Sequence, residues 1–133
     1  AKGTVHAARC RASRPDPAAK RHAWQLVTGD RSADNYAVYA TCEGFWQPEQ
    51  HAVTASYVER YFTEIPATAG LRSGWVVGES ARLAFPRYAV SAATLSLADK
   101  ALAGELDPAV RRAITDCADD LRRAVAVRAT FGG

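Results

Sequence analysis

Histidines and glutamates are the side chains here that could bind a metal ion or act as general acids and bases. The imidazoles are His6, His22 and His51. We expect them at surface or helix-end positions, with no metal site in this chain. The carboxylates of interest are Glu43, Glu49, Glu59 and Glu64. Because Glu59 and Glu64 point to different faces of one predicted helix, we expect solvated carboxylates and no catalytic pair. The phosphate-loop pattern GxxxxGK[ST] and the nucleophile pattern GxSxG are both absent.

The three cysteines are typical of packing residues in a reducing compartment and not of a catalytic thiol. Cys10, Cys42 and Cys117 are odd in number, far apart and outside any C-x-x-C pattern. We interpret them as small buried hydrophobic side chains in a reducing compartment.

The first residues lack the apolar middle region of a secretory signal, and no apolar run approaches the roughly 20 residues that span a bilayer. We therefore expect a cytoplasmic protein with no membrane partner.

Four arginines form the strongest candidate for a phosphate-reading surface. Arg111, Arg112, Arg122 and Arg123 lie on one side of the last predicted helix. Aspartates alternate with them, and the four-residue spacing predicts the ion pairs Arg112–Asp116 and Asp119–Arg123. These acids would repel a nucleic-acid backbone, and the net charge is only +3. We expect a salt-bridged solvent face and no nucleic-acid partner.

The segment 35–66 holds most of the aromatic side chains in the middle of the chain. Its two halves are apolar at helical spacing, with Tyr36 and Tyr39 on one track. Gly44 and Pro48 predict the end of one helix and the start of the next, so a corner bearing Phe45 and Trp46 should connect them. We expect the aromatic cluster to be core. Its members are Phe45, Trp46, Tyr57, Tyr61 and Phe62, of which Trp46 is the one expected to be partly exposed.

Further helices are predicted on both sides of this segment. Residues 4–13 are typical of the end of a helix, and the pair Asp16-Pro17 starts a second one that runs to Gly29. Pro66 is expected to open a segment that runs to Phe85, with three glycines spaced for a close helix contact: Gly70, Gly74 and Gly78. Ser91 should cap a helix that ends at Gly104. Asp107-Pro108 should start the last helix, with an apolar face of Val110, Ile114, Cys117, Ala118, Leu121, Ala124 and Val125.

These elements predict an all-α fold, since strand-like alternation is absent. A chain of 133 residues suits one helical domain, 1–133, built as antiparallel helical hairpins stacked in a short α-solenoid (a HEAT/armadillo-like superhelix) or a bundle. The starts D-P-A-A-K-R and D-P-A-V-R-R hint at a repeat. The chain begins with Ala and contains no Met, so we expect the C-terminal fragment of a larger protein.

Several sequence blocks resemble the C-terminal helical domain of actinobacterial aminopeptidase N, in the same order and at similar spacing. They are Asn35-Tyr36, Gly44-Phe45-Trp46-Gln47-Pro48, Tyr57-Val58-Glu59-Arg60-Tyr61-Phe62, Ile65-Pro66, Phe85-Pro86, Leu106-Asp107-Pro108 and Asp119-Asp120-Leu121-Arg122-Arg123. The similarity extends from about Ala7 to Val127. This family consists of zinc-dependent metalloaminopeptidases with an endoplasmic-reticulum-aminopeptidase-like C-terminal domain.

The resemblance implies a parent enzyme that removes N-terminal residues from peptides. The family holds zinc in an H-E-x-x-H helix with a further Glu, and binds the substrate amine in a G-A-M-E-N loop. Neither pattern occurs in this sequence, so the resemblance implies no catalytic residue and no cofactor in this segment, with zinc in a missing catalytic domain. The segment alone should be inactive.

The resemblance also implies partners and a surface. The C-terminal domain would pack on the catalytic domain of the same polypeptide, help wall the substrate chamber and contact peptide substrate indirectly. Phe45, Trp46 and Gln47 are the candidate residues for that chamber or domain interface. A free-standing helical-repeat module that binds another protein remains the alternative.

Overall fold

The computed structural model describes residues 2–130, and within them every regular element is helical. The elements are α1 (Lys2–Ala12), α2 (Pro17–Gly29), α3 (Asn35–Phe45), α4 (His51–Ala67), the 3-10 turn η1 (Thr68–Gly70), α5 (Gly74–Leu83), α6 (Ala92–Ala103) and α7 (Pro108–Thr130). The all-α prediction is confirmed for this part of the chain.

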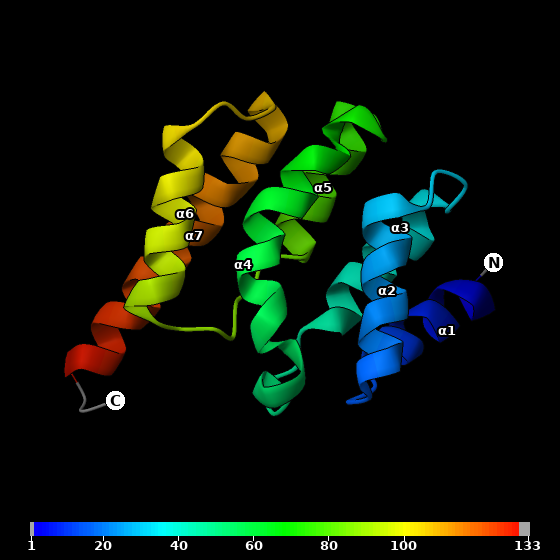
Figure 1. Ribbon diagram of the computed structural model, residues 1–133, viewed down its shortest axis with the longest axis horizontal. Coiled ribbons are helices and arrows are strands. Elements are labelled where there is room, and N and C mark those ends of the chain that lie inside the picture. The colour runs from blue at the N-terminus through cyan, green and yellow to red at the C-terminus, as the bar shows by residue number, and fades with distance from the viewer. Residues whose placement is uncertain (1, 131–133) are drawn as a thin grey trace.

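The helices follow one another along the long axis of the molecule, from α1 at one end to α6 and α7 at the other (Figure 1). Each of α2, α4 and α6 contacts the next in that series, and so do α3, α5 and α7. The two series also contact each other through the pairs α2–α3, α4–α5 and α6–α7. The first residues of α3, α5 and α7 lie towards the same edge, which is the upper one in Figure 1.

The central corner differs in detail from its prediction. Helix α3 continues through Gly44 to Phe45, and α4 begins at His51 and not at Pro48. Gly44 is needed because α1 crosses α3 there: a Cβ at this position would clash with the Arg9 carbonyl oxygen and lie 3.3 Å from the Ala12 Cβ. A close approach of two helices, and not a left-handed backbone, therefore requires this glycine.

The segment predicted to run from Pro66 to Phe85 is not a single helix. Pro66 lies inside the last turn of α4, η1 follows, and α5 begins at Gly74 after Ser73, whose hydroxyl accepts the Val76 N–H. Of the three glycines, Gly78 makes the predicted close approach, since a Cβ there would lie 2.8 Å from the Ala109 Cβ of α7.

Each Asp-Pro start places a cation against the carbonyl end of the preceding helix. Asp16 and Asp107 accept the N–H groups of Ala18 and Ala109. Lys20 Nζ donates to the Ala12 carbonyl at the end of α1 at 2.7 Å. At the equivalent position in α7, Arg111 donates to the carbonyls of Leu102 and Gly104 at the end of α6. The two starts thus share a local structure, in which a cation satisfies helix-terminal carbonyls that have no partner in their own helix.

The last helix presents its predicted face to the core. Val110, Ile114, Ala118 and Leu121 are buried, and Cys117, Ala124 and Val125 are partly buried. The expected ion pairs of its polar face are wrong. Asp116 pairs with Arg82 of α5, Arg122 with Asp99 of α6, and Arg123 with Asp120. Asp116 and Arg122 find partners on neighbouring helices, because an α-helix in a packed domain is not isolated, whereas Arg123 takes the i,i+3 partner Asp120 within α7.

Candidate functional site

The aromatic side chains of the corner between α3 and α4 are buried in the domain. Phe45 is 3% exposed and Trp46 is 2% exposed, so the predicted core cluster is confirmed and the expected partial exposure of Trp46 is wrong. The Trp46 indole Nε1 donates to the Ala84 carbonyl at 2.6 Å. A tryptophan that contacts the end of α5 in this way is removed from solvent because both its ring and its N–H find partners inside the domain.

Gln47 is the member of the predicted surface trio that is partly accessible. Its Nε2 donates to the Gly44 carbonyl at 3.0 Å and so helps to cap the end of α3. In this chain, Phe45 and Trp46 contribute packing to the corner and little side-chain surface. The role of the trio at a substrate chamber or domain interface stays a prediction.

Lys20, which the sequence analysis did not single out, is hydrogen-bonded to the same corner through the Phe45 carbonyl. Its ammonium group is fully buried, donates to the carbonyls of Ala12 and Phe45 at 2.7 and 2.6 Å, and lies 5.1 Å from the centre of the Phe45 ring. Burial lowers the pKa of Lys20 from 10.5 to about 8. One sequence signal could have identified Lys20: it follows Asp16 by four residues, as Arg111 follows Asp107 in the second Asp-Pro start.

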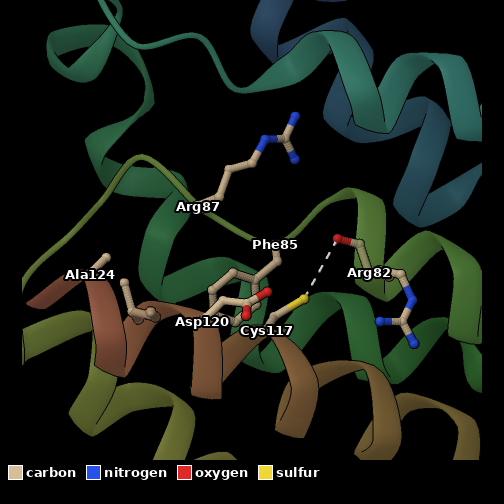
Figure 2. Close-up of a pocket in the computed structure, with 7 residues that line it drawn as sticks. Arg82, Phe85, Arg87, Cys117, Asp120 and Ala124 are labelled. Carbon is tan, nitrogen blue, oxygen red and sulfur yellow. Dashed lines mark hydrogen bonds between the residues drawn. The ribbon is translucent and has the colours of Figure 1, made fainter.

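A pocket of about 300 Å³ lies where the end of α5 meets α7 (Figure 2). Its charged lining residues are Arg82, Arg87 and Asp120, with Cys117 at its base. Figure 2 shows the Arg87 side chain extending away from the Cys117 thiol, and its guanidinium donates to the Glu43 carbonyl at 3.3 Å.

The groups of this pocket are not arranged as a catalytic set. The Cys117 thiol faces the Arg82 carbonyl at 3.9 Å, and burial raises the pKa of Cys117 to about 11. A thiol with such a pKa stays protonated at neutral pH and is a poor nucleophile. Asp120 is paired with Arg123. The pocket therefore resembles a packing defect between two helices more than an active site.

The remaining candidates for acid, base or metal chemistry are surface groups. Glu43 pairs with Arg9 at 3.0 Å, and Glu64 pairs with Arg60 at 2.7 Å while accepting the Trp24 indole N–H. The Arg60 hydrogen bond, followed by the one from Trp24, lowers the pKa of Glu64. Glu64 is thus less solvated than expected, whereas Glu49 and Glu59 are exposed as expected.

His6 and Cys10, on one face of α1, form a pair that the sequence analysis overlooked. They are four residues apart, and the Cys10 Sγ lies 3.6 Å from the His6 Nε2. Cys10 is exposed, so the expected burial is wrong for this cysteine. Among residues 2–130, no group of three or more His, Cys, Asp or Glu side chains is placed to hold a metal ion. Catalytic zinc takes three protein ligands, so these residues do not fit the zinc centre of a metalloaminopeptidase.

A second feature that sequence reasoning missed is an exposed aromatic face on α3 and α5. Trp75 is 77% exposed and Tyr36 is 69% exposed. Tyr36 was expected to share an apolar helix track with Tyr39, but it stands outside the core with its ring 6.3 Å from that of Tyr39. Trp75 follows Gly74 directly, at the start of α5, in a region whose helix boundaries the sequence did not predict. Exposed aromatic side chains on neighbouring helices are typical of a contact surface.

None of the helices between residues 2 and 130 combines the length and the hydropathy of a membrane-spanning segment.

Comparison with known proteins connects this geometry to a family. The family described as ERAP1-like C-terminal domain matches residues 1–123. The chain is also similar to Aminopeptidase N of Streptomyces lividans, with 35% identity over 130 residues. That similarity covers 97% of this chain and 15% of the relative, so the chain spans about one-seventh of the length of that protein.

Proposed function

This chain belongs to the ERAP1-like C-terminal domain family, and from that premise we propose that it is the non-catalytic C-terminal domain of a longer zinc-dependent aminopeptidase. The observation that carries the proposal is the similarity to Aminopeptidase N, which extends over 97% of this chain but only 15% of that relative. The zinc ion and the residues that hold it would belong to the rest of the polypeptide, since the described residues offer no suitable ligand group.

The domain would contribute a rigid surface to the enzyme and no chemical group. We propose that the pairs α2–α3, α4–α5 and α6–α7 are hairpins of a short α-solenoid, an arrangement supported by the contacts within the series α2, α4, α6 and within the series α3, α5, α7. Such a stack gives an extended rigid surface. Packed on the catalytic domain, it would help to wall a chamber that admits peptide ends and short peptides, in a cytoplasmic enzyme.

Three cations, of which Lys20 is buried and Arg72 and Arg111 are partly buried, suit such a rigid wall. Lys20, Arg72 and Arg111 each donate to two or more carbonyls near the end of another helix. Hydrogen bonds from a charged donor contribute about 1.5 to 3 kcal/mol each, and here they fix one helix relative to the next. A domain held in this way can keep a chamber at constant size during turnover.

The mass of the native gene product tests the proposal. An antibody raised against this chain should detect in source cells a product several times larger than 14.3 kDa. That product should hydrolyse an aminoacyl anilide and lose the activity to a chelator, whereas the 133-residue chain with added zinc should have none. A product of about 14 kDa would reject the proposal and favour the free-standing interaction module. Chelator-sensitive hydrolysis by this chain alone would also reject it.

A further inference from the structure

The exposed aromatic face includes side chains of three helices, of which α5 contacts both α3 and α7. The Tyr36 and Tyr39 rings meet edge to face on α3. The carboxylate of Glu79, on α5, is close enough to Tyr39 to help raise the pKa of that phenol, after the larger effect of burial. Glu79 lies one turn after Trp75 on the same helix. Because α3 and α5 also contact each other, Tyr39 of α3 lies on the side of that helix nearer to Glu79 of α5.

From α5 the same face continues onto α7. A hollow of about 160 Å³ is lined by Trp75, Gly78, Glu79, Arg82, Ala109 and Arg112. Gly78 brings the two helices close together, and the Arg82–Asp116 ion pair at 3.4 Å joins them further along. The surface thus combines a large indole, a hollow beside it and charges of both signs at its edge. This composition matches the apolar centre and polar rim of protein interfaces.

Trp75 has no evident role in folding this chain. Trp24 and Trp46 are 3% and 2% exposed, and their indole N–H groups donate to Glu64 and to the Ala84 carbonyl. Trp75 is 77% exposed, and its indole N–H has no hydrogen-bond acceptor among residues 2–130. Tryptophan is the residue type most enriched among side chains that dominate binding energy. Tryptophan has only two side-chain torsion angles, so fixing its ring on binding costs little conformational entropy.

We propose that this face, defined by Tyr36, Tyr39, Trp75, Glu79 and Arg112, is where the domain docks on the preceding part of its own polypeptide. This rests on the proposed function. In a parent as long as Aminopeptidase N, most of the chain lies outside this domain, and a large fixed partner is at hand. The partner surface would offer an apolar pocket for the Trp75 indole, a cation opposite Glu79 and a carboxylate opposite Arg112.

The apolar groove between α4 and α6 is the weaker candidate for this contact. Its lining includes Phe62, Pro66, Leu97 and Leu106. Phe62 is 7% exposed, and the other three are partly buried. Phe62 belongs to the core, and Leu97 and Leu106 pack against it, so a partner would remove little additional apolar surface from water.

Hydroxyl-radical footprinting of the complete gene product tests the docking face. Trypsin would release Trp75 in peptide 73–82, the buried Trp24 in peptide 22–31 and the exposed Tyr88 in peptide 88–100. We expect Trp75 to be oxidised within about threefold of the Trp24 rate, because docking would bury it as fully as an interface anchor. Tyr88, which is 44% exposed, should stay reactive and show that the domain is not shielded everywhere.

A pair of variants separates docking from general stability. In the complete gene product, Trp75→Ala should speed proteolytic release of the domain at least tenfold, the effect of losing an interface anchor, and Tyr88→Ala should leave release within about twofold because an exposed loop residue contributes little. Both replace an exposed aromatic side chain, so their comparison cancels the effect of truncation alone.

The outcomes distinguish the two levels of the proposal. A long, chelator-sensitive aminopeptidase in which Trp75 is oxidised about tenfold faster than Trp24 would overturn the docking face and leave the proposed function standing. The docking face is also overturned if the gene product is dimeric and Trp75→Ala makes it monomeric, since the occupant would then be a second copy. A gene product of about 14 kDa overturns both.

Discussion

At the scale of single residues, the buried amino group of Lys20 does what a core hydrophobe could not. Its two carbonyl partners come from Ala12 at the end of α1 and Phe45 at the end of α3. One cation therefore closes two helix ends at the place where the central corner starts. Its lowered pKa, about 8, reports the free-energy cost of keeping that charge out of water.

This pKa predicts a pH-dependent stability. Between about pH 8 and pH 10.5 the unfolded chain retains the Lys20 proton more than the folded chain does, so this group makes the protein more stable as pH rises, by up to about 1.4 kcal/mol per pH unit. The measurement is urea unfolding of the wild type and of Lys20→Met across that range. The free energy of unfolding of the wild type relative to the variant should increase with pH.

The difference in the free energy of unfolding between wild type and Lys20→Met is used because buried thiols change the stability of both proteins with pH in the opposite direction. Burial raises the pKa of Cys42 to about 12 and that of Cys117 to about 11. The folded chain therefore keeps thiol protons that the unfolded chain loses above about pH 9, and these groups lower stability as pH rises. Both proteins share that loss. A wild-type minus variant difference that stays constant from pH 8 to 10.5 would contradict the role assigned to Lys20.

At the scale of elements, the contact between α5 and α7 depends on two small residues facing each other, Gly78 and Ala109. A Cβ on Gly78 would lie 2.8 Å from the Ala109 Cβ, closer than such atoms approach. Because neither helix can move without disturbing the buried Val77 and Val110 beside them, the backbone cannot relax freely. The spacing of these helices also sets the hollow beside Trp75.

We therefore predict that Gly78→Ala destabilises the chain by about 1 to 3 kcal/mol through overpacking, even though alanine is the better helix former by about 1 kcal/mol. Chemical denaturation measures the loss. Gly29→Ala is the matched control, since no atom lies within 4 Å of a Cβ at that position, and it should cost nothing. Adding Ala109→Gly to Gly78→Ala should recover part of the stability; equal stability of Gly78→Ala and wild type would show that α5 and α7 separate easily.

At the scale of the whole molecule, the three tryptophans divide into two in the core and one on the surface. Trp24 of α2 donates to Glu64 of α4, and Trp46 of the corner donates to the Ala84 carbonyl at the end of α5. The third marks the face where α3, α5 and α7 meet solvent. This division makes intrinsic fluorescence a direct report on which side of the molecule is open.

For the 133-residue chain we predict that acrylamide quenches Trp75 and spares most emission from Trp24 and Trp46, because quenching requires contact with the exposed ring. Stern–Volmer plots of wild type and Trp75→Phe measure this, and the variant should lose most of the quenchable fraction. Trp46→Phe should retain that fraction while lowering stability, since it removes the hydrogen bond to Ala84. Identical quenching of wild type and Trp75→Phe would mean that the α3 and α5 face is covered in solution.

Local sequence signals determined the helices with clear boundaries. The Asp-Pro pairs before α2 and α7 and the serine before α6 specify N-caps within a few residues of backbone, and the apolar face of α7 follows from its own periodicity. The family resemblance, too, could be found in the sequence, because its blocks of residues are contiguous. Such features depend on neighbours along the chain.

Tertiary structure decided the exposure of the side chains at helix ends and the need for two of the glycines. Trp46 and Trp75 each lie at a helix end. Trp46 packs into the core and donates to the carbonyl of Ala84, 38 residues away, whereas Trp75 is 77% exposed. Gly44 and Gly78 are likewise explained by α1 and α7, which are distant in sequence. Burial and close approach depend on which helices meet, and that is a property of the packed molecule.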